Sequence, residues 1–192
     1  MDSIDLFLSP HLDDAPTSCG GLIHQLATRG RHVIAATIFA GVPDGRVSAY
    51  ADEVHRSWRM NTAAVAIGAR REEDRRAMAI TGGEPLHLDL LDAIYRRNGT
   101  GWLCESWRDV TGEPRDDAGF ASTIVDRGRE APASHRIGTI YAPLGVGNHV
   151  DHQWTHRAAR QLGDRGHAVL FYEEVPGHCR IQRIVVSGGG LS

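Results

Sequence analysis

The first forty residues contain two short apolar segments on either side of a helical pattern. Residues 4–8 and 32–39 are apolar, and the second segment is rich in β-branched side chains, so both are predicted strands. Between them, Gly20 and Gly21 open a helical pattern over 22–27, which stops at Arg29 and Gly30. This order predicts a βαβ unit, and therefore parallel strands joined by a crossover helix.

The rest of the chain continues the alternation of strands and helices. Its pattern predicts helices over 52–68, 70–81 and 152–162, strands over 85–91, 137–142 and 168–172, and a long surface loop over 97–117. We therefore expect an α/β fold, Rossmann-like, with a mostly parallel β-sheet flanked by helices. A last strand is expected at 183–187, and the glycine-rich end at 187–192 has the composition of a disordered or truncated tail.

Composition narrows the class of protein. The chain has 192 residues and a formal net charge of −3, which gives no electrostatic reason to bind nucleic acid or an anionic membrane. Cys19, Cys104 and Cys179 are far apart and form no CxxC pair, which favours a reducing compartment over a disulfide framework. No signal peptide and no apolar run of membrane-spanning length is present, so we expect a cytoplasmic protein without stable membrane insertion.

Two clusters of imidazoles and carboxylates follow two of the predicted strands. The first holds His11, Asp13 and Asp14, directly after the strand at 4–8. The second holds His149, Asp151 and His152, after the strand at 137–142. Open α/β sheets place their ligand sites at the carboxyl ends of strands, so we expect the two clusters to form one site.

The residue types in these clusters suit a catalytic zinc, which needs three protein ligands, an open position and a nearby base. His11 and Asp14 can reach one ion from a single turn, and His152 would complete the set. Asp13 is then the remaining carboxylate, placed to accept a proton from water. His149 could stabilise an oxyanion or protonate a leaving nitrogen, and Asp151 could fix the tautomer of an imidazole.

Simpler interpretations exist for each cluster. An Asp-Asp pair before a helix is often an N-cap, which bonds backbone N–H groups and interacts with the helix dipole. A His-x-x-His pattern on a helix often lies at the surface, and the chain contains eleven histidines. The position of both clusters after predicted parallel strands favours the metal site.

The motifs SPHLDD at 9–14, with Gly20-Gly21 after them, and HVDH at 149–152 resemble the two signatures of the zinc-dependent PIG-L/LmbE-like N-acetylglucosaminyl deacetylases. The segments 70–77 and 88–96 resemble the family as well, so the likeness covers about residues 4–175. Leu12 and Ala15 replace the proline and glutamate that are commonest in the first motif. The resulting His-Leu-Asp-Asp-Ala sequence is similar to that of a bacterial branch of the family.

This resemblance implies that His11, Asp14 and His152 bind one Zn²⁺, that Asp13 is the general base, and that His149 is the acid or oxyanion stabiliser. It also implies a single deacetylase domain over 1–192, truncated or disordered after about residue 180. The expected reaction is removal of an N-acetyl group from an N-acetylglucosamine-type amino sugar or its glycoconjugate. The alternatives are an amidase for a larger acyl group, such as a thiol conjugate or a lipid amide, and a non-catalytic metal- or sugar-binding remnant.

Substrate contacts are less well indicated. Asp92, Tyr95 and Arg96 could face a sugar, but an exposed, salt-bridged helix end is the favoured interpretation. Trp102 and Trp107, in the predicted loop, could stack on a sugar ring or pack within the protein. A nucleotide-binding Rossmann protein is disfavoured because Gly20-Gly21 lacks the surrounding G-x-G-x-x-G pattern.

Overall fold

The computed structural model describes residues 3–99, 101–116, 118–130 and 135–174. Cys179, the strand expected at 183–187 and the glycine-rich tail lie outside the described residues. Within those that are described, no helix combines the length and the apolar character needed to cross a membrane.

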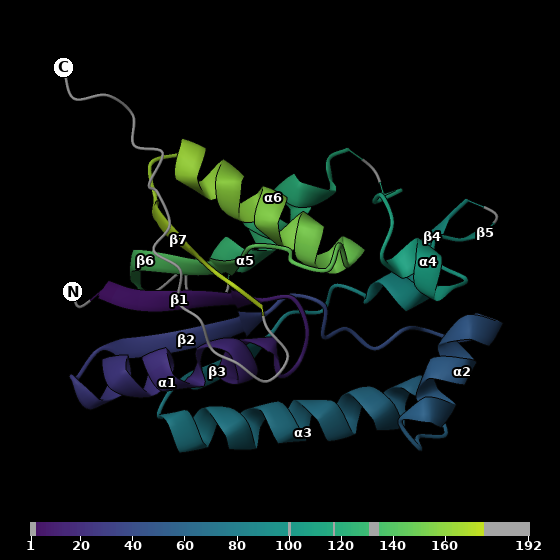
Figure 1. The fold of residues 1–192 in the computed structure, drawn as a ribbon, viewed down its shortest axis with the longest axis horizontal. Helices are drawn as coiled ribbons and strands as arrows, with labels where there is room; N and C mark the ends of the chain where they lie inside the picture. The colour runs from purple at the N-terminus through teal and green to yellow at the C-terminus, as the bar shows by residue number, and fades with distance from the viewer. Residues whose placement is uncertain (1–2, 100, 117, 131–134, 175–192) are drawn as a thin grey trace.

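A five-stranded sheet forms the centre of the structure (Figure 1). Its spatial order is β3-β2-β1-β6-β7, and every neighbouring pair is parallel. The strands are β1 (Ser3–Ser9), β2 (His32–Thr37), β3 (Glu84–His87), β6 (Arg136–Pro143) and β7 (Ala168–Tyr172). This arrangement confirms the predicted α/β fold with a parallel sheet.

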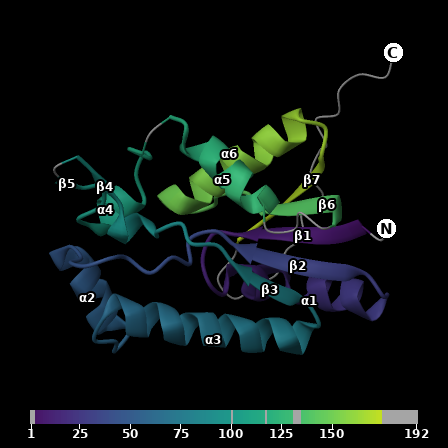
Figure 2. The ribbon, with the colours of Figure 1, turned by 180° about the vertical axis from the view of Figure 1, so that it is seen from behind.

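Helices cover both faces of the sheet, as a parallel sheet requires (Figures 1 and 2). On one face lie α1 (Asp14–Thr28) and α3 (Ala63–Thr81), and on the other lie α5 (Phe120–Glu130) and α6 (Val150–Asp164). Shorter elements gather beyond the carboxyl ends of the strands: α2 (Ala49–Ser57), η1 (Ala93–Tyr95), β4 (Arg97–Asn98), β5 (Gly101–Trp102) and α4 (Trp107–Val110).

The central strand β1 shows how the sequence builds both halves of the core. Successive side chains of a strand point to opposite faces. Leu6 and Leu8 therefore pack with α5 and α6, whereas Phe7 packs with α1 and with Met78 of α3. All three side chains are almost fully buried, so the whole strand is held rigidly. The turn that follows it starts from a fixed position.

Several element boundaries differ from the predicted ones. The helix expected over 52–68 is two helices, because α2 ends at Ser57, Arg59 has a left-handed backbone with φ of 61°, and Thr62 caps α3 by accepting the Val65 N–H. Helix α1 begins at Asp14, so Gly20 and Gly21 lie inside it. Helix α5 occupies a segment for which no element was predicted.

Candidate metal centre

The two sequence clusters meet at the carboxyl ends of the adjacent strands β1 and β6. His11 and Asp14 lie in the turn from β1 into α1, and His152 lies in the first turn of α6, after β6. The chain runs outward from β1 to β2 and β3, and β6 lies on the other side of β1. The clusters therefore occupy the point where the strand order reverses, which is where α/β sheets bind ligands.

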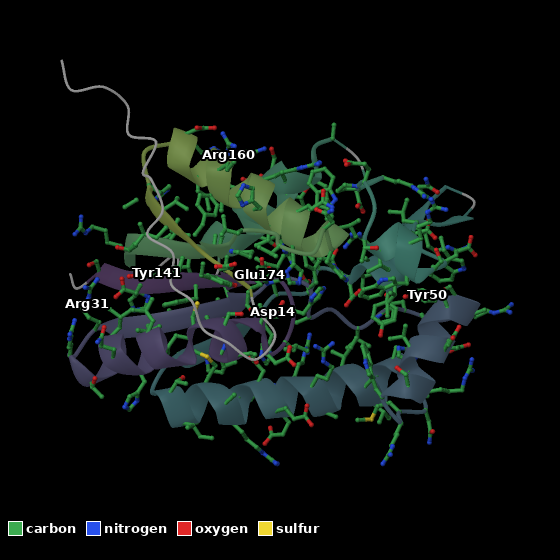
Figure 3. All side chains as sticks on the ribbon, in the orientation of Figure 1. Asp14, Arg31, Tyr50, Tyr141, Arg160 and Glu174 are labelled. Carbon is green, nitrogen blue, oxygen red and sulfur yellow. The ribbon has the colours of Figure 1, made fainter. Side chains whose placement is uncertain are left out.

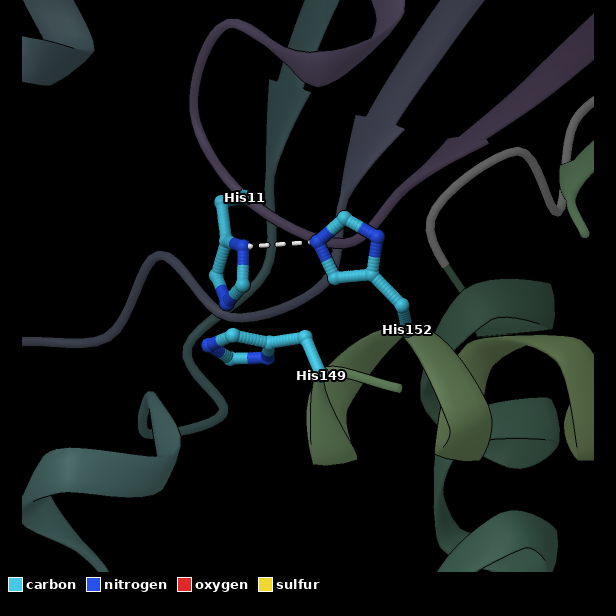
Figure 4. A group of neighbouring side chains, drawn as sticks. All are labelled: His11, His149 and His152. Carbon is cyan, nitrogen blue, oxygen red and sulfur yellow. Dashed lines mark hydrogen bonds between the residues drawn. The ribbon is translucent and has the colours of Figure 1, made fainter. Parts of the chain in front are cut away.

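Three donor atoms from these clusters converge on one point. His11 Nδ1 lies 3.2 Å from His152 Nε2, and Asp14 Oδ2 lies 3.4 Å from His11 Nδ1 and 3.3 Å from His152 Nε2. Figure 4 shows the two imidazoles edge to edge at this point. Zn–N bonds of about 2.0–2.1 Å in a tetrahedral site place neighbouring ligand atoms about 3.3–3.4 Å apart. The donor triangle therefore has the size and the chemistry of a zinc site.

The other ring nitrogen of His11 is held by Asp151, a fully buried carboxylate. His11 Nε2 lies 2.9 Å from Asp151 Oδ2, which also accepts the Ala93 N–H at 3.0 Å. Arg96 NH1 pairs with Asp151 Oδ1 at 2.5 Å. A carboxylate in this position favours the proton on Nε2 and leaves Nδ1 free to bind a metal. Asp151 thus contacts an imidazole of the site, as its position between the two histidines suggested.

His152 is held in a similar way by Glu174, which was not singled out in the sequence. Glu174 Oε1 bonds to His152 Nδ1, and its Oε2 accepts the N–H groups of Gly145 at 2.7 Å and Val146 at 3.1 Å. Figure 3 labels Glu174 and Asp14, which contact opposite ring nitrogens of His152. A carboxylate directly after the predicted strand at 168–172 was the available signal, since all parallel strands end at the same edge of the sheet.

Asp13 lies next to the donor triangle but is not part of it. Its side chain is 63% exposed and its Oδ1 lies 3.2 Å from Arg70 NH2. Partial loss of solvent raises the pKa of the Asp13 carboxyl, although the Arg70 guanidinium opposes this shift. Asp13 occupies the N-cap position of α1 without making a side-chain capping bond. Ser9 accepts the Ala15 N–H instead, so the capping interpretation of Asp13 does not hold.

His149 caps α6 through its own ring. Its Nδ1 accepts the Asp151 N–H at 3.2 Å, which directs the opposite edge of the ring toward the site. The ring centroid lies 4.6 Å from that of His11 and 5.2 Å from that of His152 (Figure 4). Burial, together with the charge of His11, lowers the pKa of His149 to about 3.

The charges of the three donors are strongly coupled. Burial disfavours the cation of His11, but Asp92, Asp14 and Asp151 outweigh this effect and raise the His11 pKa well above its usual value. Burial likewise opposes the charge of His152, yet Asp14 and Glu174 raise its pKa to about 9. Burial would raise the pKa of Asp14, but its bonds to the two histidines lower it far below the usual range. Asp14 is thus a carboxylate at neutral pH, as a metal ligand must be.

Two other groups of donors lie close enough to hold an ion. One combines His11 and His152 with His149, and the other combines His11 with Asp92 and Asp151. In the second group, Asp151 already bonds Ala93 and Arg96. In the first, one nitrogen of His149 already caps α6. The triangle that includes Asp14 leaves the contacts of Asp151 and His149 in place, while Asp14 Oδ2 itself accepts the backbone N–H of His11 at 2.8 Å. Its three members are the ligands expected from the sequence.

The expectation of an exposed helix end at 92–96 is wrong. Tyr95 is 3% exposed and bonds His55 through its hydroxyl, and Arg96 is 7% exposed. Arg96 pairs with both Asp151 and Asp116, so a charged side chain that looked like surface serves as the support of the site. Trp102 packs under Arg97, whereas Trp107 is 68% exposed. Arg96 could not be recognised from the local pattern because its partners lie 20 and 55 residues away.

Comparisons with known proteins point to one family of deacetylases. The family model described as PIG-L, GlcNAc-PI de-N-acetylase, matches residues 6–162. A 2'-N-acetylparomamine deacetylase of Streptomyces fradiae is 33% identical over 175 residues, which are 89% of this chain and 56% of that protein. The corresponding deacetylase of Niallia circulans is 26% identical over 188 residues, with 89% of this chain and 66% of that protein covered.

A solved structure of a deacetylase has a similar fold. The zinc-inhibited form of a teicoplanin deacetylase superposes with a TM-score of 0.79 and 28% identity, covering 91% of this chain and 68% of the other. This chain therefore spans between about half and two thirds of the length of these relatives. The family match confirms the resemblance seen in the two sequence motifs.

Proposed function

Since this chain belongs to the PIG-L family of GlcNAc-PI de-N-acetylases, we propose that it is a metal-dependent N-deacetylase of amino sugars. The observation that carries the proposal is the donor triangle of His11, Asp14 and His152 at the carboxyl ends of β1 and β6. Two imidazoles and a carboxylate leave room for a fourth ligand, which is the arrangement of catalytic zinc sites.

His11, Asp14 and His152 would hold the ion, with Asp151 and Glu174 orienting the two imidazoles from behind. When bound, zinc would polarise the amide carbonyl and lower the pKa of a bound water to about 7. The protein holds the donor atoms in place and positions the side chains that transfer protons beside them.

Asp13 would accept the proton of the attacking water. Its carboxylate is next in the chain to the Asp14 donor and is exposed, so solvent and substrate can reach it. His149 faces the site from α6. Its lowered pKa keeps the imidazole neutral and its Nδ1 accepts the Asp151 N–H, so its Nε2–H would donate a hydrogen bond to the oxyanion. Water adds to the acyl carbon, the C–N bond breaks, and the products are acetate and a free amine.

For the substrate we infer an N-acetylated amino sugar carried on a larger molecule. This inference rests on relatives that act on N-acetylparomamine and teicoplanin, an aminoglycoside precursor and a glycopeptide. A panel of N-acetylparomamine, N-acetylglucosaminyl phosphatidylinositol and N-acetylglucosamine, each also with longer acyl chains, separates the deacetylase from an amidase for larger acyl groups.

The test is acetate release by the zinc-loaded protein, together with its metal content. The wild-type protein should bind one zinc per chain and release acetate from at least one member of the panel. Asp13→Ala should keep the metal and lose about 10²–10⁴-fold in kcat, the usual contribution of a general base. Glu72→Ala, an exposed carboxylate on α3, is the matched control and should retain full activity.

The outcomes of these assays distinguish the deacetylase from the alternatives. Normal turnover of Asp13→Ala would exclude Asp13 as the base. Bound zinc without hydrolysis of any panel member would favour a non-catalytic metal-binding protein. Preferential release of longer acyl groups would favour the amidase.

A further inference from the structure

Asp13 has a backbone conformation that L-residues rarely adopt. Its φ is 90° and its ψ is −16°, in the left-handed region. In this region the Cβ of an L-residue crowds the backbone, and Asp13, unlike a glycine, has a Cβ. Residues persist in this region only where their surroundings force them to, and such residues cluster at functional sites. The surroundings of Asp13 should therefore contain groups that hold it.

Those groups come from α3, a helix about sixty residues later in the sequence (Figure 1). Asp74 accepts the Asp13 N–H through Oδ1 at 3.2 Å. Arg70, one turn earlier on the same helix, donates to the Leu12 carbonyl at 2.8 Å. The Leu12 carbonyl and the Asp13 N–H belong to the same peptide group, so α3 holds both ends of one peptide plane. The orientation of that plane sets the φ of Asp13.

Asp74 is itself fixed from behind. It is 1% exposed, and its Oδ2 lies 2.8 Å from Nε2 of His87. His87 ends the edge strand β3, where its register opposite Thr37 of β2 fixes its position, and its side chain is 8% exposed. A buried carboxylate with both oxygens engaged cannot turn away from the Asp13 amide without losing a bond. None of these three contacts involves a donor atom of the metal triangle.

We propose that Asp74, supported by His87, is a positioning residue that holds the Leu12–Asp13 peptide in one orientation and so directs the Asp13 carboxylate toward the site. The proposal rests on the function proposed above, in which Asp13 is the general base. Without the Asp74 acceptor, the peptide can rotate and release the left-handed backbone of Asp13. The base is then displaced, while the metal donors, which lie on other atoms, keep their contacts.

Two substitutions of similar size separate positioning from simple packing. Asp74→Asn keeps an oxygen for the Asp13 N–H, and its amide can donate to His87 Nε2, so we expect kcat within about threefold of wild type. Asp74→Leu removes the acceptor, and we expect kcat to fall about 10–100-fold with little change in KM, because small displacements of a catalytic group cost up to about 10²-fold. Where the leucine variant fails to fold, Asp74→Ala replaces it.

A double-mutant cycle distinguishes an effect through Asp13 from a general loss of structure. In an Asp13→Ala background, Asp74→Leu should cause no further loss of residual kcat, because the group that it positions is already missing. An equal loss in both backgrounds would overturn the proposal, as would wild-type kcat in Asp74→Leu.

Hydrogen exchange at the Asp13 amide tests the clamp without relying on activity. The Asp13 N–H should exchange slowly in the wild-type protein and in Asp74→Asn, and at least tenfold faster in Asp74→Leu. Unchanged exchange in Asp74→Leu would overturn the proposal. If the wild-type protein hydrolyses nothing while this pattern is observed, the proposed function has failed and the clamp has not.

Discussion

Arg96 is a buried cation between two buried carboxylates, so its removal tests whether this charge stabilises the protein behind the site. Its guanidinium pairs with Asp151 at 2.5 Å and Asp116 at 2.6 Å and donates to the Leu91 carbonyl at 2.9 Å. It also lies against the rings of Phe39 and Phe120, about 5 Å from each centroid. Arg96→Leu keeps an apolar side chain against the rings but leaves both carboxylates without their cation.

The expected cost follows from this burial. Asp151 is 0% and Asp116 is 7% exposed at the side chain, so water cannot replace the lost partner. Breaking a buried pair by removing one member costs about 3–5 kcal/mol of unfolding free energy. The surface Arg76–Glu72 pair, with side chains 73% and 50% exposed, provides the matched control. Arg76→Leu should cost only about 0–1 kcal/mol.

Urea unfolding of the metal-free protein, with chelator present, measures both variants without a contribution from bound metal. A slope of about 2.5 kcal/mol per molar urea converts the loss into a midpoint lowered by about 1–2 M for Arg96→Leu. The Arg76→Leu midpoint should stay within about 0.4 M of wild type. Equal midpoints for the two variants would refute the inference that Arg96 neutralises the carboxylates behind the site.

Three further predictions concern the metal and the thiols. Glu174→Gln should weaken zinc affinity about 10–100-fold in a chelator competition, because the bond that orients His152 is altered; an affinity equal to that of the control Glu173→Gln would contradict this role. Free zinc at about 100 times its Kd should raise the unfolding free energy by about 2.7 kcal/mol, and His152→Ala should abolish the gain; the same gain in that variant would place the ion elsewhere. Burial raises the pKa of Cys104 to about 12, so only about one molecule in 10⁴ is thiolate at pH 8. In a Cys179→Ser background the native protein should therefore resist thiol reagents until it unfolds, and rapid labelling would contradict the burial of Cys104 and Cys19.

The centre of the sheet could be predicted because β1 and β2 are short, mostly apolar segments that are buried on both faces. The split between α2 and α3 was missed. It depends on the left-handed backbone of Arg59, which helix propensity does not show, and on the cap at Thr62, a favourable N-cap residue that was the local signal. Helix α5 was missed because its apolar residues, at 120, 121, 124 and 125, cover fewer than two turns, and its packing against α6 completes it.

Part of the site could be predicted from the sequence, and part could not. The clusters at 11–14 and 149–152 are compact motifs at strand ends, so residue type and position were enough to bring them together. Their supports are single charged residues scattered along the chain, as Arg96, Asp74 and Glu174 show. Isolated charged residues usually lie at the surface, and only the fold shows that these are buried or bonded to the site. Long-range contacts of this kind leave no local signal in one sequence.

We infer that His11, Asp14 and His152 bind one zinc ion. An anomalous difference map of zinc-soaked crystals, recorded at the zinc absorption edge, would locate this ion. We expect one strong peak per chain, about 2.0–2.2 Å from His11 Nδ1, Asp14 Oδ2 and His152 Nε2. A peak on the Nε2 side of His11, between Asp92 and Asp151, or no peak at the donor triangle, would contradict it.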